Sequence, residues 1–154
     1  MMARSATFLA LYLASTLFAA AADFSTLRNG GTARVTAIVD GDTVALDDGR
    51  EVRFVGIQAP KLPLGRPDFQ KWPFADEAKA AVGALAQGKR VTLHFGGRET
   101  DRYGRALAHL VTEDGSWLQG DLLRRGFARV YSFADNRALV REMLALEAEA
   151  RAAR

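Results

Sequence analysis

The sequence of 154 residues contains no cysteine and only two histidines, His94 and His109. Without cysteine the chain can form no disulfide, no thiolate metal site, no cysteine nucleophile and no lipidated N-terminal cysteine. Two histidines are too few for a histidine-rich metal site, so we interpret both as structural.

A strong charge imbalance is also missing. Lys plus Arg number 21 and Asp plus Glu number 18, which gives a formal net charge of +3. Hydrophobic residues make up 49% and charged residues 25%, and this balance excludes wholesale disorder and a multi-span membrane protein. The length predicts one compact domain. The weakly basic charge suits an anionic partner such as nucleic acid, but it does not by itself indicate one.

A long apolar run occurs only at the N-terminus. Arg4 precedes a charge-free run from Ser5 to Ala22 that ends in the alanines Ala19 to Ala22. This pattern predicts a secretory signal peptide over residues 1–22 and a mature domain over residues 23–154, secreted or periplasmic, monomeric and without stable membrane association. The alternative is an uncleaved membrane anchor, although the run is at the short limit of the roughly 20 residues that span a bilayer.

Short apolar runs separated by turn signals fill the rest of the chain. The predicted strands are 32–38, 43–46, 51–57, 90–95 and 106–111, and the predicted helices are 74–87, 116–125 and 137–153. Five strands with a helix after the third fit an α+β fold based on a β-barrel. We therefore predict a small, closed, five-stranded Greek-key barrel of the OB type with three helices.

All four prolines lie in the segment 58–73. Because proline cannot donate to a sheet ladder, this segment is predicted to be a long ordered loop. It is also rich in cations and aromatic residues, which is typical of a groove where bases stack and cations follow phosphates. Alternatively, Trp72 and Phe74 pin the loop to the barrel.

Two charged patterns can carry chemistry. In Asp40-Gly41-Asp42, a turn brings two carboxylates together, which suits a hard cation with oxygen ligands or is an ordinary hairpin turn. Arg53 lies within an apolar strand, where it either needs an anionic partner or is exposed. Arg105 ends a loop against a strand and can aim at the same point. Two arginines on one phosphate would grip it and stabilise the charge that develops when phosphorus is attacked.

Three motifs in this order resemble the staphylococcal nuclease (thermonuclease-like) family. They are Val-Asp-Gly-Asp-Thr at 39–43, Val-Arg-Phe-Val-Gly-Ile at 52–57 and Thr-Asp-Arg-Tyr-Gly-Arg at 100–105. The likeness covers about residues 32–150 and includes Leu-Leu-Arg-Arg-Gly-Phe-Ala-Arg-Val at 122–130. The resemblance implies an OB barrel capped by three helices and calcium-dependent hydrolysis of DNA and RNA phosphodiesters.

The resemblance also implies roles for individual residues. Asp42 matches the aspartate that binds calcium directly, and Asp40 matches one that acts beside it. Arg53 and Arg105 match the catalytic arginines that hold the scissile phosphate. Tyr103 matches a tyrosine that contacts substrate phosphate.

One segment departs from the family pattern. Where catalytic members carry Asp-x-Pro-Glu, this chain has Gln58-Ala59-Pro60-Lys61. The Gln58 amide and the Ala59 carbonyl can still serve as calcium ligands, but one charge is lost and calcium affinity should fall. Lys61, with an ordinary pKa near 10.4, is protonated at neutral pH and cannot take a proton from water. We place it among the substrate-binding residues.

Two functions remain open from the sequence. The first is an exported nuclease of the thermonuclease type, with calcium as cofactor and weak or altered activity on nucleic acid. The second is a non-catalytic phosphate or nucleic-acid binding module on the same fold. Asp42 and both arginines favour the first, whereas Gln58 and Lys61 favour the second.

Overall fold

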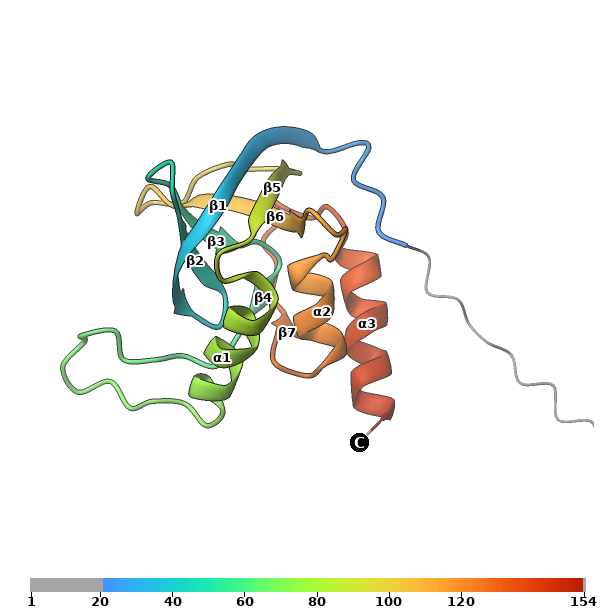
Figure 1. The fold of residues 1–154 in the computed structure, drawn as a ribbon. Helices are drawn as coiled ribbons and strands as arrows, with labels where there is room; N and C mark the ends of the chain where they lie inside the picture. The colour runs from blue at the N-terminus through green and yellow to red at the C-terminus, as the bar shows by residue number, and fades with distance from the viewer. Residues whose placement is uncertain (1–20, 154) are drawn as a thin grey trace, which may run out of the picture.

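The fold of this computed structural model, which describes residues 21–153, is a closed barrel of five strands with three helices (Figure 1). The barrel strands are β1 (Arg28–Asp40), β2 (Thr43–Leu46), β3 (Glu51–Phe54), β5 (Arg90–Phe95) and β6 (Ala106–Thr112), arranged in the order β1-β2-β3-β6-β5. The long strand β1 closes the barrel by pairing antiparallel with both β2 and β5, and β3 pairs parallel with β6. The predicted five-stranded barrel is confirmed.

Side chains alternate across the barrel wall, as the pleat of a strand requires. In β5, Val91, Leu93 and Phe95 are buried while the residues between them are more exposed. Val44 and Phe54 from β2 and β3 are fully buried in the same core. The core therefore lies inside the barrel and continues beneath the helices.

The prediction of one strand over 51–57 is wrong. β3 ends at Phe54 because Gly56 takes φ +84°, a left-handed conformation that breaks an extended strand. A side chain at Gly56 would also meet the Met143 side chain, because a Cβ there would lie 2.4 Å from its Cε. After this turn β4 (Ile57–Gln58) pairs with β7 (Arg129–Val130) in a separate two-stranded ribbon. This change of partner carries Gln58 away from the barrel sheet.

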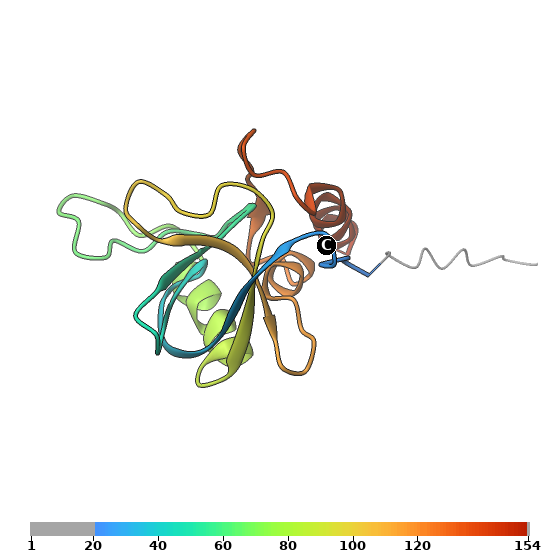
Figure 2. The same cartoon turned by 90° about the horizontal axis from the view of Figure 1, so that it is seen from above.

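The three helices are α1 (Ala75–Ala86), α2 (Leu118–Arg124) and α3 (Val140–Ala152). Each is shorter than predicted, and α3 begins only after Leu139, whose φ of 60° is incompatible with a helix. Helix α1 packs on β1, while α2 and α3 pack on each other beside the barrel (Figures 1 and 2). No helix among residues 21–153 is long and apolar enough to span a membrane. The predicted signal peptide lies almost wholly outside the described residues.

The segment between β4 and α1 is a long loop that extends away from the barrel in Figure 1 and in Figure 2. Its first residues are anchored, since Ala59 and Leu62 are buried. Trp72 and Phe74 are 41% and 70% exposed, so the interpretation that these two rings pin the loop is wrong. The loop is held by its start, and Lys61 lies in this anchored part.

Candidate functional site

Side chains from three parts of the chain meet in a hollow at one side of the barrel. Two adjoining cavities, of about 640 and 900 Å³, share Arg53 from β3, Lys61 from the long loop, and Tyr103 and Arg105 from the β5–β6 loop. We call this hollow the cation-lined cavity. It brings together the two arginines, the lysine and the tyrosine that the sequence singled out, and Asp40 lies on its wall.

Asp42 lies at the base of this region, in the turn between β1 and β2. Its carboxylate is fully buried, and its Oδ2 accepts the Ala59 N–H at 2.8 Å. Oδ2 and Oδ1 also accept hydrogen bonds from the Lys61 Nζ at 2.7 and 3.0 Å. The Arg53 guanidinium lies 3.5 Å from Oδ2. Asp42 is therefore surrounded by donors.

The turn that places Asp42 has a simple local cause. Asp40 accepts the backbone N–H of Asp42 with Oδ1 at 3.0 Å, which closes the turn through a side chain. Gly41 between them has no room for a side chain, because a Cβ would lie 2.7 Å from that of Ala59 and 2.8 Å from that of Ala78. The Asp-Gly-Asp motif is thus both a turn and the support of the site.

The two aspartates have opposite pKa shifts. Burial alone would raise the pKa of Asp42, but Arg53 and Lys61 outweigh it and hold that pKa below the ordinary value. For Asp40, burial first and the negative charge of Asp42 second raise the pKa. Asp42 is consequently a stable carboxylate that is neutralised by two cations.

Arg53 is oriented by backbone carbonyls. Its guanidinium donates to the carbonyl oxygens of Phe54 at 2.5 Å and Ile57 at 2.7 Å, and only 15% of its side chain is exposed. The turn after β3 supplies these acceptors. The alternative of an exposed strand arginine is wrong, because the side chain lies over the turn and faces the cavity.

Arg105 is oriented by Asp101 in the β5–β6 loop. Asp101 accepts the Arg105 Nε at 2.8 Å and the backbone N–H groups of Tyr103 and Arg105 at 2.9 and 3.0 Å. The Arg105 guanidinium also lies 5.4 Å from the centre of the Tyr103 ring, which is 66% exposed. Asp101 thus holds Arg105 beside the Tyr103 ring at the cavity, and the substrate roles of Arg105 and Tyr103 remain predictions.

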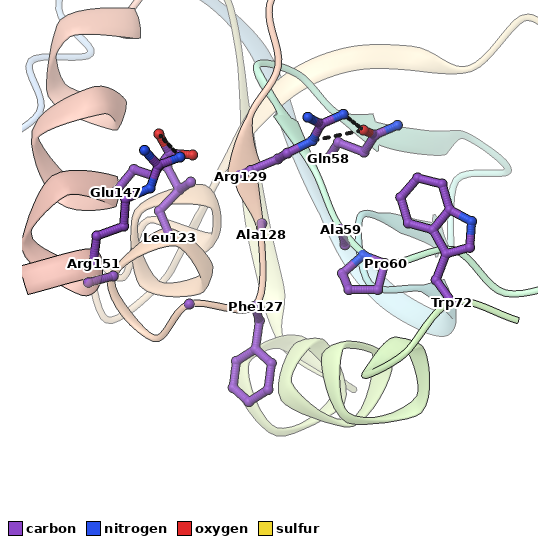
Figure 3. Close-up of a pocket in the computed structure, with 12 residues that line it drawn as sticks. Gln58, Ala59, Pro60, Trp72, Leu123, Phe127, Ala128, Arg129, Glu147 and Arg151 are labelled. Atoms are coloured by element: carbon purple, nitrogen blue, oxygen red, sulfur yellow. Dashed lines mark hydrogen bonds and ion pairs between the residues drawn. The ribbon is translucent and has the colours of Figure 1, made fainter. Parts of the chain in front are cut away.

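The expected calcium ligands are Asp42, Asp40, Gln58 and Ala59, and their arrangement does not fit that ion. The Gln58 amide oxygen accepts two hydrogen bonds from Arg129, at 2.6 and 3.1 Å (Figure 3). Both oxygens of Asp42 are bound to the Lys61 ammonium. Within residues 21–153, no three His, Asp or Glu side chains are grouped so that they could hold a metal ion. Two cations of the chain thus occupy the side-chain oxygens of Asp42 and Gln58, two of the four ligands that calcium would be expected to use.

Sequence reasoning missed an aromatic pair at the edge of the cation-lined cavity. Tyr131 and Phe133 line it, with ring centroids 5.2 Å apart and planes at 86°. Phe133 is 61% exposed, so core packing does not explain its position. The signal was the alternation Val-Tyr-Ser-Phe at 130–133, which places both rings on one side of an extended segment. Arg98 and Arg102 also line the cavity and add cations.

A second, smaller cavity of about 290 Å³ lies beside the Gln58–Arg129 contact (Figure 3). Trp72 and Phe127 border it, and its walls come from the long loop, β7 and α3. Gln58 lines both this cavity and the cation-lined cavity. The Gln58–Arg129 contact therefore forms part of the boundary between them.

The chain matches the family model described as staphylococcal nuclease homologue over residues 51–154, which is more than half of its length. It belongs to the staphylococcal nuclease homologue family. An uncharacterized endonuclease of Escherichia coli is 36% identical over 101 residues, which cover 64% of this chain and 60% of that protein. The thermonuclease of Staphylococcus hyicus is 29% identical over 116 residues, which cover 70% of this chain and 64% of that protein.

The endonuclease YhcR of Bacillus subtilis is 31% identical over 105 residues, which cover 63% of this chain but only 9% of that protein. The chain thus spans less than two thirds of each of these three relatives.

Proposed function

We propose that this chain is a nuclease that binds the phosphodiester backbone of nucleic acid in the cation-lined cavity and hydrolyses it slowly. The observation that carries the proposal is the convergence of Arg53, Lys61 and Arg105 on one hollow beside Tyr103. Relatives named as endonucleases and as a thermonuclease support the reaction class.

The arginines suit the charge changes of this reaction. Attack of water on phosphorus places more negative charge on the phosphoryl oxygens, and donors that are already oriented stabilise that charge without reorganising. Arg53 is oriented by two carbonyls and Arg105 by Asp101. Planar guanidinium groups also match the geometry of phosphate oxygens better than a point charge does.

The aromatic side chains add a surface for bases. Tyr103 and Phe133 are largely exposed at the same cavity, and exposed rings stack on unpaired bases of any sequence. Positive groups that follow the backbone and rings that stack on bases together favour a single-stranded segment over a free phosphate.

Lys61 explains why we propose slow hydrolysis. The resemblance places a water-activating glutamate at this position, and an ammonium cannot accept a proton from water. Calcium-dependent hydrolysis, as expected from the resemblance, would also require Asp42 to exchange the Lys61 ammonium for the metal ion. We therefore do not include calcium in the proposed reaction.

The Lys61–Asp42 ion pair also favours a second candidate function. Lys61 and Arg53 face the cavity, and together they compensate the charge of Asp42. Such a site is suited to binding a phosphate without cleaving it. A non-catalytic nucleic-acid binding module is consequently the alternative.

A cleavage assay separates these two functions. Purified protein is incubated with plasmid DNA and with a labelled single-stranded oligonucleotide, in calcium and in chelator. We expect slow cleavage that Arg105→Ala abolishes and that Arg90→Ala retains. Arg90 is a matched control because it too is paired with a carboxylate, at 3.1 Å from Glu113, but outside the cavity. Binding without cleavage under both conditions would establish the binding module instead.

Export is part of the proposal and is tested separately. We propose that residues 1–22 are removed as a signal peptide and that the mature protein is a secreted or periplasmic monomer. Expressed in a bacterium, the protein should be recovered outside the cytoplasm with a new N-terminus near residues 21–23. N-terminal sequencing that finds Met1 on cytoplasmic protein would contradict export.

A further inference from the structure

The contact between Lys61 and Asp42 gives the site a cation that belongs to the chain itself. The Lys61 Nζ binds both oxygens of a carboxylate that has no exposed surface, while 19% of the lysine side chain remains exposed. A divalent cation that binds a carboxylate through both oxygens would occupy the same place. The ammonium and such a metal ion exclude each other.

The position of Lys61 is fixed by its neighbours in the chain. Ala59 on one side donates its N–H to Asp42, and Leu62 on the other is buried. The carbonyl of Lys61 accepts the Trp72 N–H at 3.0 Å, which ties the two ends of the loop together. The Lys61 side chain therefore reaches Asp42 from an anchored segment of backbone.

The charges around Asp42 do not favour a second cation. One carboxylate faces two positive groups, with the Lys61 ammonium at 2.7 Å and the Arg53 guanidinium at 3.5 Å. Asp40 also lines the cavity and adds at most one negative charge to Asp42, Lys61 and Arg53, so these four side chains carry no net negative charge. They therefore offer calcium no net electrostatic attraction, while the Arg53 and Lys61 side chains that line the cavity attract a phosphate.

The amide oxygen of Gln58, another expected calcium ligand, is also occupied by a cation of the chain. Arg129 donates both its Nε and a terminal nitrogen to the Gln58 amide oxygen. That contact is built on the pairing of β4 with β7, so the fold and not a chance rotamer positions the two residues. A cation from the chain therefore stands at two of the expected metal-binding positions, Asp42 and Gln58.

We propose that Lys61 replaces the divalent cation, so that the site binds phosphodiesters without metal and has no useful affinity for calcium. The ligand class rests on the proposed function, whereas the lack of calcium binding does not. An ammonium carries three donors. Two of them are directed to Asp42, and the third is available to a phosphate oxygen in the cavity.

The first experiment uses the unmodified protein and needs no nucleic acid. Its thermal midpoint Tm is measured in chelator and in about 10 mM calcium, a concentration above the dissociation constants of weak calcium sites in proteins. We expect the two Tm values to agree within about 1 °C. A rise of more than about 3 °C in calcium would overturn the proposal.

The second experiment measures binding of a labelled single-stranded oligonucleotide by fluorescence anisotropy at matched ionic strength. The unmodified protein should bind equally well in chelator and in calcium, within about twofold, and Lys61→Gln should bind at least about tenfold more weakly in chelator. A calcium requirement in the unmodified protein would contradict the inference. Failure to bind at all would contradict the proposed function, while the Tm result would still stand.

Replacing Lys61 and Gln58 by acidic residues should make the Tm of the protein respond to calcium. In Gln58→Asp combined with Lys61→Glu, Asp42 loses its ammonium and carboxylates stand at the two positions where the family pattern has them, so the Tm should rise by at least about 5 °C in calcium. Lys71→Gln is the matched control, because Lys71 lies in the same loop and pairs with Asp76 of α1, but both side chains are exposed. Its Tm should not respond to calcium. If the double variant does not fold even in calcium, Lys61→Arg, which keeps a cation at Asp42, should remain indifferent to calcium, and a calcium response there would contradict the inference.

Discussion

Two regions of the molecule bury titratable side chains in different charge states. In the cation-lined cavity, Asp42 is fully buried and charged, because Lys61 and Arg53 compensate it. Beneath the N-terminal segment, His109 is 1% exposed and packs against an aromatic ring, with the Trp117 ring centre 5.6 Å away. Burial lowers the pKa of His109 to about 4, so it is neutral.

The difference shows what a charge needs in order to stay buried. Moving an ion out of water costs several kcal/mol, which is repaid only by close and well-oriented opposite charges. Asp42 has two such partners and faces a cavity, whereas His109 has an aromatic cluster around it and no carboxylate within hydrogen-bonding distance among the described residues. The chain retains buried charge where an anionic ligand would approach and removes it where only packing is required.

The largest effect should follow from removing the compensating charge at Asp42. Lys61→Met leaves a buried carboxylate with Arg53 as its one ion-pair partner within residues 21–153, and we expect a loss of about 3 kcal/mol in the free energy of unfolding, the lower end for breaking a buried ion pair. Urea denaturation at pH 7 measures it. Lys71→Met, which removes the exposed ion pair with Asp76, should leave the free energy of unfolding nearly unchanged. A similar loss in both variants would show that burial of Asp42 does not matter.

The second prediction concerns His109 and the dependence of the free energy of unfolding on pH. His109 has a pKa near 4 in the folded protein, below the ordinary value of about 6.5 expected in the unfolded chain. Between these values the unfolded state binds more protons, so stability is complete above about pH 6.5 and falls as the pH drops toward 4, by about 2 to 3 kcal/mol. His94, whose pKa burial also lowers, acts in the same direction.

Chemical denaturation from pH 7.5 to 4 checks this slope. The control is His109→Leu, which places a side chain that cannot titrate against Phe24 and Trp117. In this variant the free energy of unfolding should depend less on pH over this range. An unchanged slope in that variant would mean that other groups cause the loss of stability.

The third prediction compares exposed and covered aromatic rings. Phe133→Ala should weaken binding of a single-stranded oligonucleotide by about 1 to 2 kcal/mol, in the range of base stacking on aromatic side chains. Because Phe133 is 61% exposed, its removal should leave the free energy of unfolding within about 0.5 kcal/mol of the parent. Fluorescence anisotropy and urea denaturation give the two numbers. A loss of stability without a loss of binding would remove this ring from the proposed interface.

The smallest effect should come from the aromatic cluster of Phe24, His94, His109 and Trp117. Phe24 packs on His94 and Trp117, with centroid distances of 4.9 and 5.7 Å, and is half-buried. Phe24→Ala should therefore lower the free energy of unfolding by about 1 kcal/mol, the value of such an aromatic contact. Oligonucleotide binding should not change, in contrast to Phe133→Ala. Weaker binding in the Phe24 variant would mean that the two regions are coupled.

The sequence predicted the barrel well because its signals are local. Apolar residues alternate with period two in 90–95, and turn residues separate the short apolar runs, so the five barrel strands and three helices were found with errors mainly at their ends. The same local order placed Arg53 on a strand and Arg105 at the end of a loop, and the closed barrel brings both to one cavity.

The tertiary structure alone decided what Gln58 and Lys61 do. Their side-chain types showed that the family pattern is altered, but their partners are distant in the chain: Arg129 is 71 residues from Gln58, and Asp42 is 19 residues from Lys61. Which cation reaches which oxygen depends on the pairing of β4 with β7 and on the anchored start of the long loop. No periodicity or spacing encodes such contacts, because they arise only when separate segments pack together. Arg129 reaches Gln58 at the surface, whereas Lys61 compensates the buried charge of Asp42.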